Sequence, residues 1–110
     1  MSYQHKDLAA GRWQKFSFIE QMANIGSEVE RALNWQAKNN VDYAQKAVGR
    51  ALELIDLTLE SVHDYPHLKE IARMREAVVD YFFGTNQFMS TDASWRKYFL
   101  CFTYAARINH

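Results

Sequence analysis

One arginine in this chain occupies a position where an apolar residue is expected. The segment LKEIARMREAVVDYFFG, residues 68–84, carries apolar residues at helical spacing, and Arg75 falls near the centre of that stripe. An unpaired guanidinium inside a protein is very costly, so Arg75 is expected to meet a carboxylate, several carbonyl groups or water. Two roles stay open for it: a buried ion pair that fixes helix register, which we favour, or a site for an anion such as phosphate.

The level of Arg75 along its helix indicates which carboxylates it could meet. In an up-down bundle the midpoint of the first helix falls near Glu28, and Glu53 lies beside the midpoint of the second. Glu28 flanks its own apolar stripe, whereas Glu53 points largely away from its stripe. We therefore predict Glu28 as the partner of Arg75, with Glu30 and Glu53 as less favoured ones. The hydroxyl of Thr58 faces the core and could add a hydrogen bond.

Two acidic pairs have the spacing that metal sites use. Glu53 and Asp56 stand three residues apart on one helix face, where paired carboxylates could hold Mg²⁺. Glu60 and His63 form an E-x-x-H pair, but a di-iron bundle needs two such pairs and two further glutamates. We favour a solvated acidic face and a surface histidine, and we expect no cofactor unless Mg²⁺ binds at the first pair. The sequence contains no nucleophile elbow, Cys–His signature or glycine-rich phosphate loop.

Capping and helix-ending residues divide the chain into four helical segments. Ser17 and Glu20 form a capping box, Pro66 suits a first helical turn, and Gly84 suits a helix end. No segment shows the period-two alternation of a strand. We therefore predict an all-α, up-down-up-down four-helix bundle, with helices over residues 17–39, 44–62, 65–83 and about 92–107.

Composition limits the classes of protein to which the chain could belong. Its 110 residues fit one domain, in which residues 1–14 are expected to form a flexible or loosely docked tail. Thirteen basic residues balance thirteen acidic ones, so the charge does not indicate nucleic acid or an anionic membrane as a partner. Cys101 is the only cysteine, and no apolar run resembles a signal peptide or a membrane span. We expect a cytoplasmic protein.

Several large side chains fall outside the predicted apolar faces. Leu100, Tyr104 and Arg107 lie opposite the core face of the last helix, and Trp35 lies off the stripe of the first. Exposed aromatic side chains beside arginine are typical of interfaces, which predicts a homodimer or a surface for a protein partner. Two alternatives stay open, because single exposed apolar residues are common and the N-terminal tail could cover these.

Three segments carry a resemblance to known proteins: EQMANIGSEVERAL (residues 20–33), RALELIDLT (50–58) and KEIARMREAVVDYFFG (69–84). They resemble a small prokaryotic family of four-helix proteins. In length, helix order and aromatic-rich last helix, the chain is also similar to HEPN-like bundles, including the helical partners of minimal nucleotidyltransferases. HEPN ribonucleases carry a histidine four to six residues after an arginine, and this chain has no such pair in a suitable place. The resemblance therefore implies an accessory role without ribonuclease activity.

A second resemblance supports a different class of function. The Glu53 and Asp56 pair resembles half of the metal motif of all-α nucleoside-triphosphate pyrophosphatases, but the preceding helix reads EVER at residues 28–31 where that family has E-x-x-E. Our leading hypothesis is a non-enzymatic, self-associating interaction or accessory protein, such as a HEPN-like partner of a nucleotidyltransferase or toxin–antitoxin system. The alternative is a nucleotide-binding or nucleotide-hydrolysing enzyme that uses Mg²⁺ and the residues Glu28, Glu53, Asp56 and Arg75.

Overall fold

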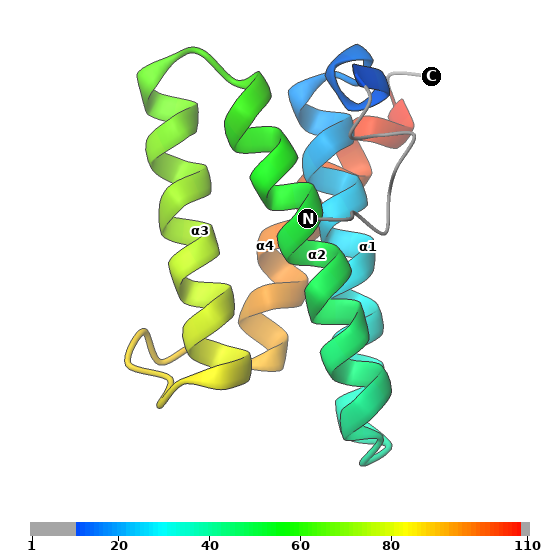
Figure 1. Cartoon of the computed structure of the whole chain (residues 1–110). Coiled ribbons are helices and arrows are strands. Elements are labelled where there is room, and N and C mark those ends of the chain that lie inside the picture. Colours follow the sequence, from blue (N-terminus) through cyan, green and yellow to red (C-terminus); the bar gives the residue numbers. More distant parts are fainter. Residues whose placement is uncertain (1–10, 109–110) are drawn as a thin grey trace.

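The computed structural model describes residues 11–108 of the chain. Its elements are a short 3-10 helix, η2 (Trp13–Lys15), followed by α1 (Phe18–Ala37), α2 (Val41–Ser61), α3 (Tyr65–Phe83) and α4 (Asp92–Ile108) (Figure 1). No strand occurs within the described residues. The prediction of an all-α four-helix bundle is confirmed, and the helix ends lie within three residues of the expected ones.

Side-chain caps explain where the helices begin. The Ser17 hydroxyl accepts from the Glu20 N–H at 3.1 Å, and the Glu20 carboxylate accepts from the Ser17 N–H at 2.9 Å. Asn40 and Asp64 cap α2 and α3 in the same way, each accepting a backbone N–H three residues ahead at 3.1 Å. Each such cap stabilises its helix by about 1 kcal/mol. These contacts are local in the chain, which is why the sequence pattern locates them.

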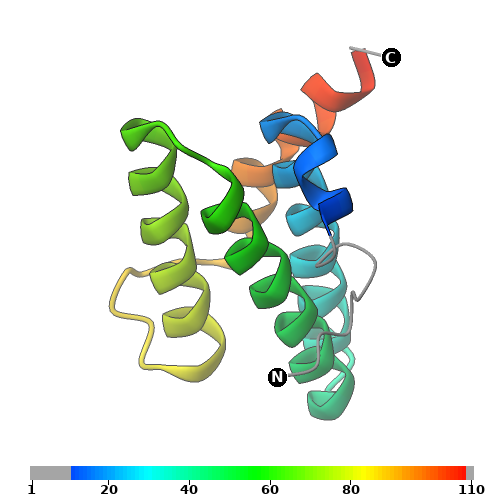
Figure 2. The ribbon, with the colours of Figure 1, turned by 45° about the horizontal axis from the view of Figure 1, so that its top comes forward.

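The four helices do not pack symmetrically. α1 contacts both α2 and α4 closely, whereas α3 makes its helix contacts mainly with α2. Figures 1 and 2 both show α3 standing apart from α1.

Within the described part of the chain, no helix is both long and apolar enough to cross a bilayer. The buried core is made mainly by α1 and α2, through Met22, Ile25, Val29, Leu33, Val48, Ala51 and Ile55.

α4 approaches α1 very closely at one glycine. A Cβ atom built on Gly26 would lie only 2.8 Å from the Phe99 Cβ, a distance that real side chains essentially never show. Phe99 itself is buried. The missing side chain at Gly26 therefore lets the Phe99 ring lie directly on the backbone of α1.

The N-terminal segment is partly docked into this core. Trp13 is 1% exposed, and its Nε1 donates to the Thr58 hydroxyl at 2.9 Å. The Trp13 carbonyl accepts from Gln21 Nε2 at 3.0 Å. The prediction of a tail over residues 1–14 is therefore wrong for Trp13, because tertiary contacts bury a side chain that no helical pattern marks. Residues 1–10 lie outside the described range.

Candidate functional site

Arg75 does not lie in the core. Its side chain is 40% exposed, and its Nε donates to Asp56 Oδ1 of α2 at 2.8 Å. The expectation that it meets a carboxylate is confirmed, but the predicted burial and the predicted partner Glu28 are both wrong. The physical reason is the position of α3, which packs on α2 and stands apart from α1. A helix that packs closely against one neighbour buries a narrow stripe, here Ile71, Met74 and Val78, and leaves Arg75 at its edge.

Glu28 is the buried carboxylate of the bundle, and other arginines hold it. It is 7% exposed, and it accepts from Arg31 Nη1 and from Arg50 Nε, both at 2.8 Å. Arg50 comes from α2, so this ion pair joins α1 to α2. Thr58 is fully buried as expected, but its hydroxyl bonds to Trp13 and to the Leu54 carbonyl at 2.8 Å.

The predicted polar constellation is therefore split between different places. Glu28 pairs with Arg50, whereas Arg75 pairs with Asp56. Thr58 bonds to Trp13. Glu53 is partly buried on α2. Sequence reasoning missed Arg50, although its position one turn before Leu54 on a strongly apolar helix was a usable signal.

The two ion pairs should differ clearly in their contribution to stability. Arg75→Met is expected to lower the free energy of unfolding by at most about 1 kcal/mol, because both partners of that pair are part-exposed. Arg50→Met is expected to lower it by about 2 kcal/mol, because the buried Glu28 would keep only Arg31 as a counter-ion. Urea unfolding of the two variants measures both values. Equal losses would contradict this assignment of the buried carboxylate.

The carboxylates of the magnesium hypothesis are already engaged with cations. Asp56 accepts from Arg75, and two guanidinium groups hold Glu28. Within residues 11–108, no group of three or more His, Cys, Asp or Glu side chains is placed to hold a metal ion. Glu60 and His63 are exposed at the end of α2. The geometry thus adds no support to the enzyme hypothesis.

Three of the four predicted interface residues gather on one helix. Leu100 and Tyr104 are each 64% exposed, and Arg107 is exposed one turn further along α4. Trp35 is elsewhere, since its ring meets the ring of Tyr43 edge-on at 4.8 Å in the α1–α2 hairpin. We use the name α4 ridge for the exposed apolar side chains of α4 at four-residue spacing, Leu100, Tyr104 and Ile108.

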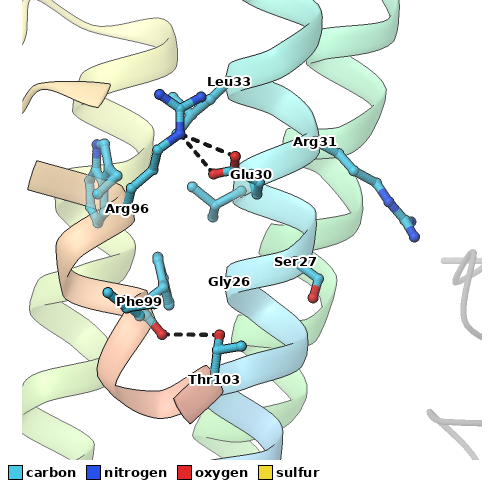
Figure 3. Close-up of a pocket in the computed structure, with 11 residues that line it drawn as sticks. Gly26, Ser27, Glu30, Arg31, Leu33, Arg96, Phe99 and Thr103 are labelled. Carbon is cyan, nitrogen blue, oxygen red and sulfur yellow. Dashed lines mark hydrogen bonds and ion pairs between the residues drawn. The ribbon is translucent and has the colours of Figure 1, made fainter. Parts of the chain in front are cut away.

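A groove runs beside the α4 ridge, between α1 and α4 (Figure 3). This α1/α4 groove has a volume of ≈ 530 Å³, and the small residues Gly26, Ser27 and Thr103 contribute to its lining. Arg96 crosses it, and its Nε donates to both carboxylate oxygens of Glu30 at 3.1 and 3.0 Å. Leu100 belongs both to the ridge and to the groove lining, so the two features are contiguous.

A second and larger groove separates α3 from α4, and the sequence did not predict it. This α3/α4 groove has a volume of ≈ 880 Å³. Two tyrosine–carboxylate hydrogen bonds cross between the helices, from Tyr98 to Glu70 at 2.9 Å and from Tyr81 to Asp92. Burial and the Glu70 carboxylate raise the pKa of Tyr98 well above its usual value, and burial together with the hydrogen bond to Asp92 raises the pKa of Tyr81 to about 12.

Comparison with known proteins adds no relative from which a function could be transferred: no protein family, curated protein or solved structure matches this chain. The similarity to HEPN-like bundles therefore stays a prediction from the sequence.

Proposed function

We propose that this chain is a non-enzymatic helical interaction protein that forms a homodimer through the α4 ridge and the α1/α4 groove. The observation that carries the proposal is that an exposed apolar ridge and a hollow lined in part by the small residues Gly26, Ser27 and Thr103 lie side by side on one face. In a two-fold dimer the same surface of both copies meets, so the ridge of each copy can enter the groove of the other.

The charges on this face favour a second copy of the chain as the partner. α4 carries Arg96, Lys97 and Arg107, and it has no acidic residue after Asp92. The α1 carboxylate that lines this groove is Glu30, whereas Glu28 is buried against Arg50 and Glu20 belongs to the capping box. When α4 of one copy lies along α1 of the other, the exposed cations Lys97 and Arg107 can approach Glu30 of that copy, and two-fold symmetry makes this contact twice. We further propose that the dimer acts as an accessory partner of a nucleotidyltransferase or of a toxin–antitoxin system. This second part of the proposal is supported by the sequence resemblance to HEPN-like bundles.

Leu100→Asp is expected to convert the dimer into a folded monomer. The substitution places a charge in the contact and removes the burial of a leucine, which contributes about 1.5–3 kcal/mol in each of the two symmetric positions. The dimer dissociation constant should therefore rise at least about a hundredfold. Gel filtration with light scattering over a range of protein concentrations measures this change, and circular dichroism checks that the helices persist.

Val41→Asp is the matched control, because Val41 is as exposed as Leu100 but lies at the start of α2. It should leave the dimer unchanged. A wild-type chain that stays monomeric at high concentration would refute the dimer. An equal loss of dimer in Val41→Asp would refute the assignment of this face.

A further inference from the structure

The α3/α4 groove exists because α3 and α4 are packed on different partners. α4 packs closely on α1 at Gly26, whereas α3 packs on α2. The tyrosine bridges from Tyr98 and Tyr81 span the resulting gap without closing it. Its volume of ≈ 880 Å³ lies within the range of roughly 300–1,000 Å³ that small-molecule sites occupy.

The inner surface of this groove is apolar and aromatic. Met74 of α3 and Trp95 of α4 are both buried, and Ala77 and the Tyr98 ring extend the same surface. Within the described residues, the Trp95 indole N–H is the one buried polar side-chain group that lacks a hydrogen-bond partner. Packing that leaves such a donor unpaired costs stability, so this region is not optimised for stability alone.

An ordered loop holds another aromatic side chain at the edge of the groove. The Asp80 carboxylate accepts from the backbone N–H of Gln87 at 2.9 Å and from that of Phe88 at 3.0 Å. Met89 adopts a φ of 56°, a left-handed conformation that is strained for a residue other than glycine. Phe88 lines the groove and is more than half exposed. The loop therefore has a strained backbone at Met89, and it holds the exposed Phe88 ring beside the apolar surface of the α3/α4 groove.

The outer wall of the groove carries two cations that pair with no other side chain of the described residues. Lys69 and Arg73 stand one turn apart on α3 and are exposed, and within residues 11–108 neither side chain makes a hydrogen bond or an ion pair. The nearby Glu70 carboxylate already accepts from Tyr98. Glu70 stands between the two cations and Glu76 lies one turn closer to the loop, so the end near Pro66 carries two positive charges against one negative charge. The end near Pro66 is thus the end suited to an anionic group.

We propose that the α3/α4 groove binds a small aromatic carboxylate. The ring lies on the buried surface of Met74 and Trp95, since thioether and aromatic side chains favour contact with aromatic rings. The carboxylate lies at Lys69 and Arg73, where a guanidinium can donate two parallel hydrogen bonds to it. The α3/α4 groove shares Trp95 with the α1/α4 groove, but Lys69, Arg73 and Met74 line only the α3/α4 groove, so the binding test does not depend on the proposed dimer.

Calorimetric titration of the full chain with 1-naphthoate and with its neutral analogue 1-naphthalenemethanol tests the proposal. We expect one saturable site per chain, with naphthoate bound about three- to fivefold more tightly than the alcohol, the size expected for an exposed ion pair. Arg73→Gln should remove this preference and leave the binding of the alcohol unchanged. Lys46→Gln, which removes an exposed cation from α2, is the control and should change neither affinity.

Ala77→Phe gives a second test, because the added ring would fill the apolar surface. Both probes should then bind at least about tenfold more weakly. If this variant does not unfold cooperatively on heating, Arg73→Gln decides alone, since Arg73 is exposed and its loss leaves the core intact. No saturable binding of naphthoate up to about 10 mM, equal affinity for the two probes, or an unchanged preference in Arg73→Gln would each overturn the proposal.

Discussion

Trp13→Ala is expected to lower the free energy of unfolding by about 3–5 kcal/mol, which is a large part of the stability of a domain of this size. The indole of Trp13 is fully buried in the core, and its N–H bonds to Thr58. Its removal would leave a cavity and would expose the end of α2 that η2 covers. Urea or thermal unfolding followed by circular dichroism measures the loss.

Trp35→Ala is the matched control, because Trp35 is a partly buried tryptophan that contacts mainly Tyr43 and Lys38. It should cost about 1–2 kcal/mol, the usual range for a residue outside the core. If Trp13→Ala cost no more than Trp35→Ala, Trp13 would belong to the loosely docked tail that the sequence predicts over residues 1–14.

Gly26→Ala is expected to lower the free energy of unfolding by about 2 kcal/mol, although alanine is the better helix former. The new methyl group would collide with the Phe99 Cβ at 2.8 Å and with two ring atoms at 2.9 Å, so α4 would have to move away from α1. Gly49→Ala is the matched control, since Gly49 lies inside α2 with nothing within 4 Å of its absent Cβ. That substitution should raise stability by up to about 1 kcal/mol.

A double-mutant cycle separates the collision from other effects of Gly26→Ala. Phe99→Ala removes the Cγ and Cδ1 atoms that lie 2.9 Å from the new methyl group and leaves only the Cβ, so Gly26→Ala should cost less in that background, with a coupling of about 1 kcal/mol. A cost that is the same in both backgrounds would mean that the contact with Phe99 is not what limits the position. Destabilisation by Gly49→Ala would show instead that helix flexibility matters at both glycines.

Helix boundaries and the exposed ridge were predictable because they depend on neighbours in the sequence. The capping box of Ser17 and Glu20 involves contacts three residues apart, and Pro66 acts through its own backbone. Helical periodicity likewise placed Leu100 and Tyr104 opposite the core face of α4, where the structure finds them exposed. Both predictions need only the geometry of a single helix.

The pairing of the charged residues was not predictable in the same way. Helical periodicity gives the direction in which Arg75 points but not the distance to the next helix in that direction. A symmetric bundle would have buried it against α1, whereas the structure leaves it part-exposed beside Asp56. Trp13 escaped prediction because a helix of three residues has no periodicity to show which side chain is buried.

The sequence by itself thus determined four helices, their ends and the outward face of α4, since each is decided by contacts within a few residues. Only the tertiary structure decided how far apart the helices lie. The bare backbone at Gly26 and the ion pair between Arg96 and Glu30 bring α4 onto α1, while α3 packs on α2. That difference in packing distance opens the α3/α4 groove and removes Arg75 from the core.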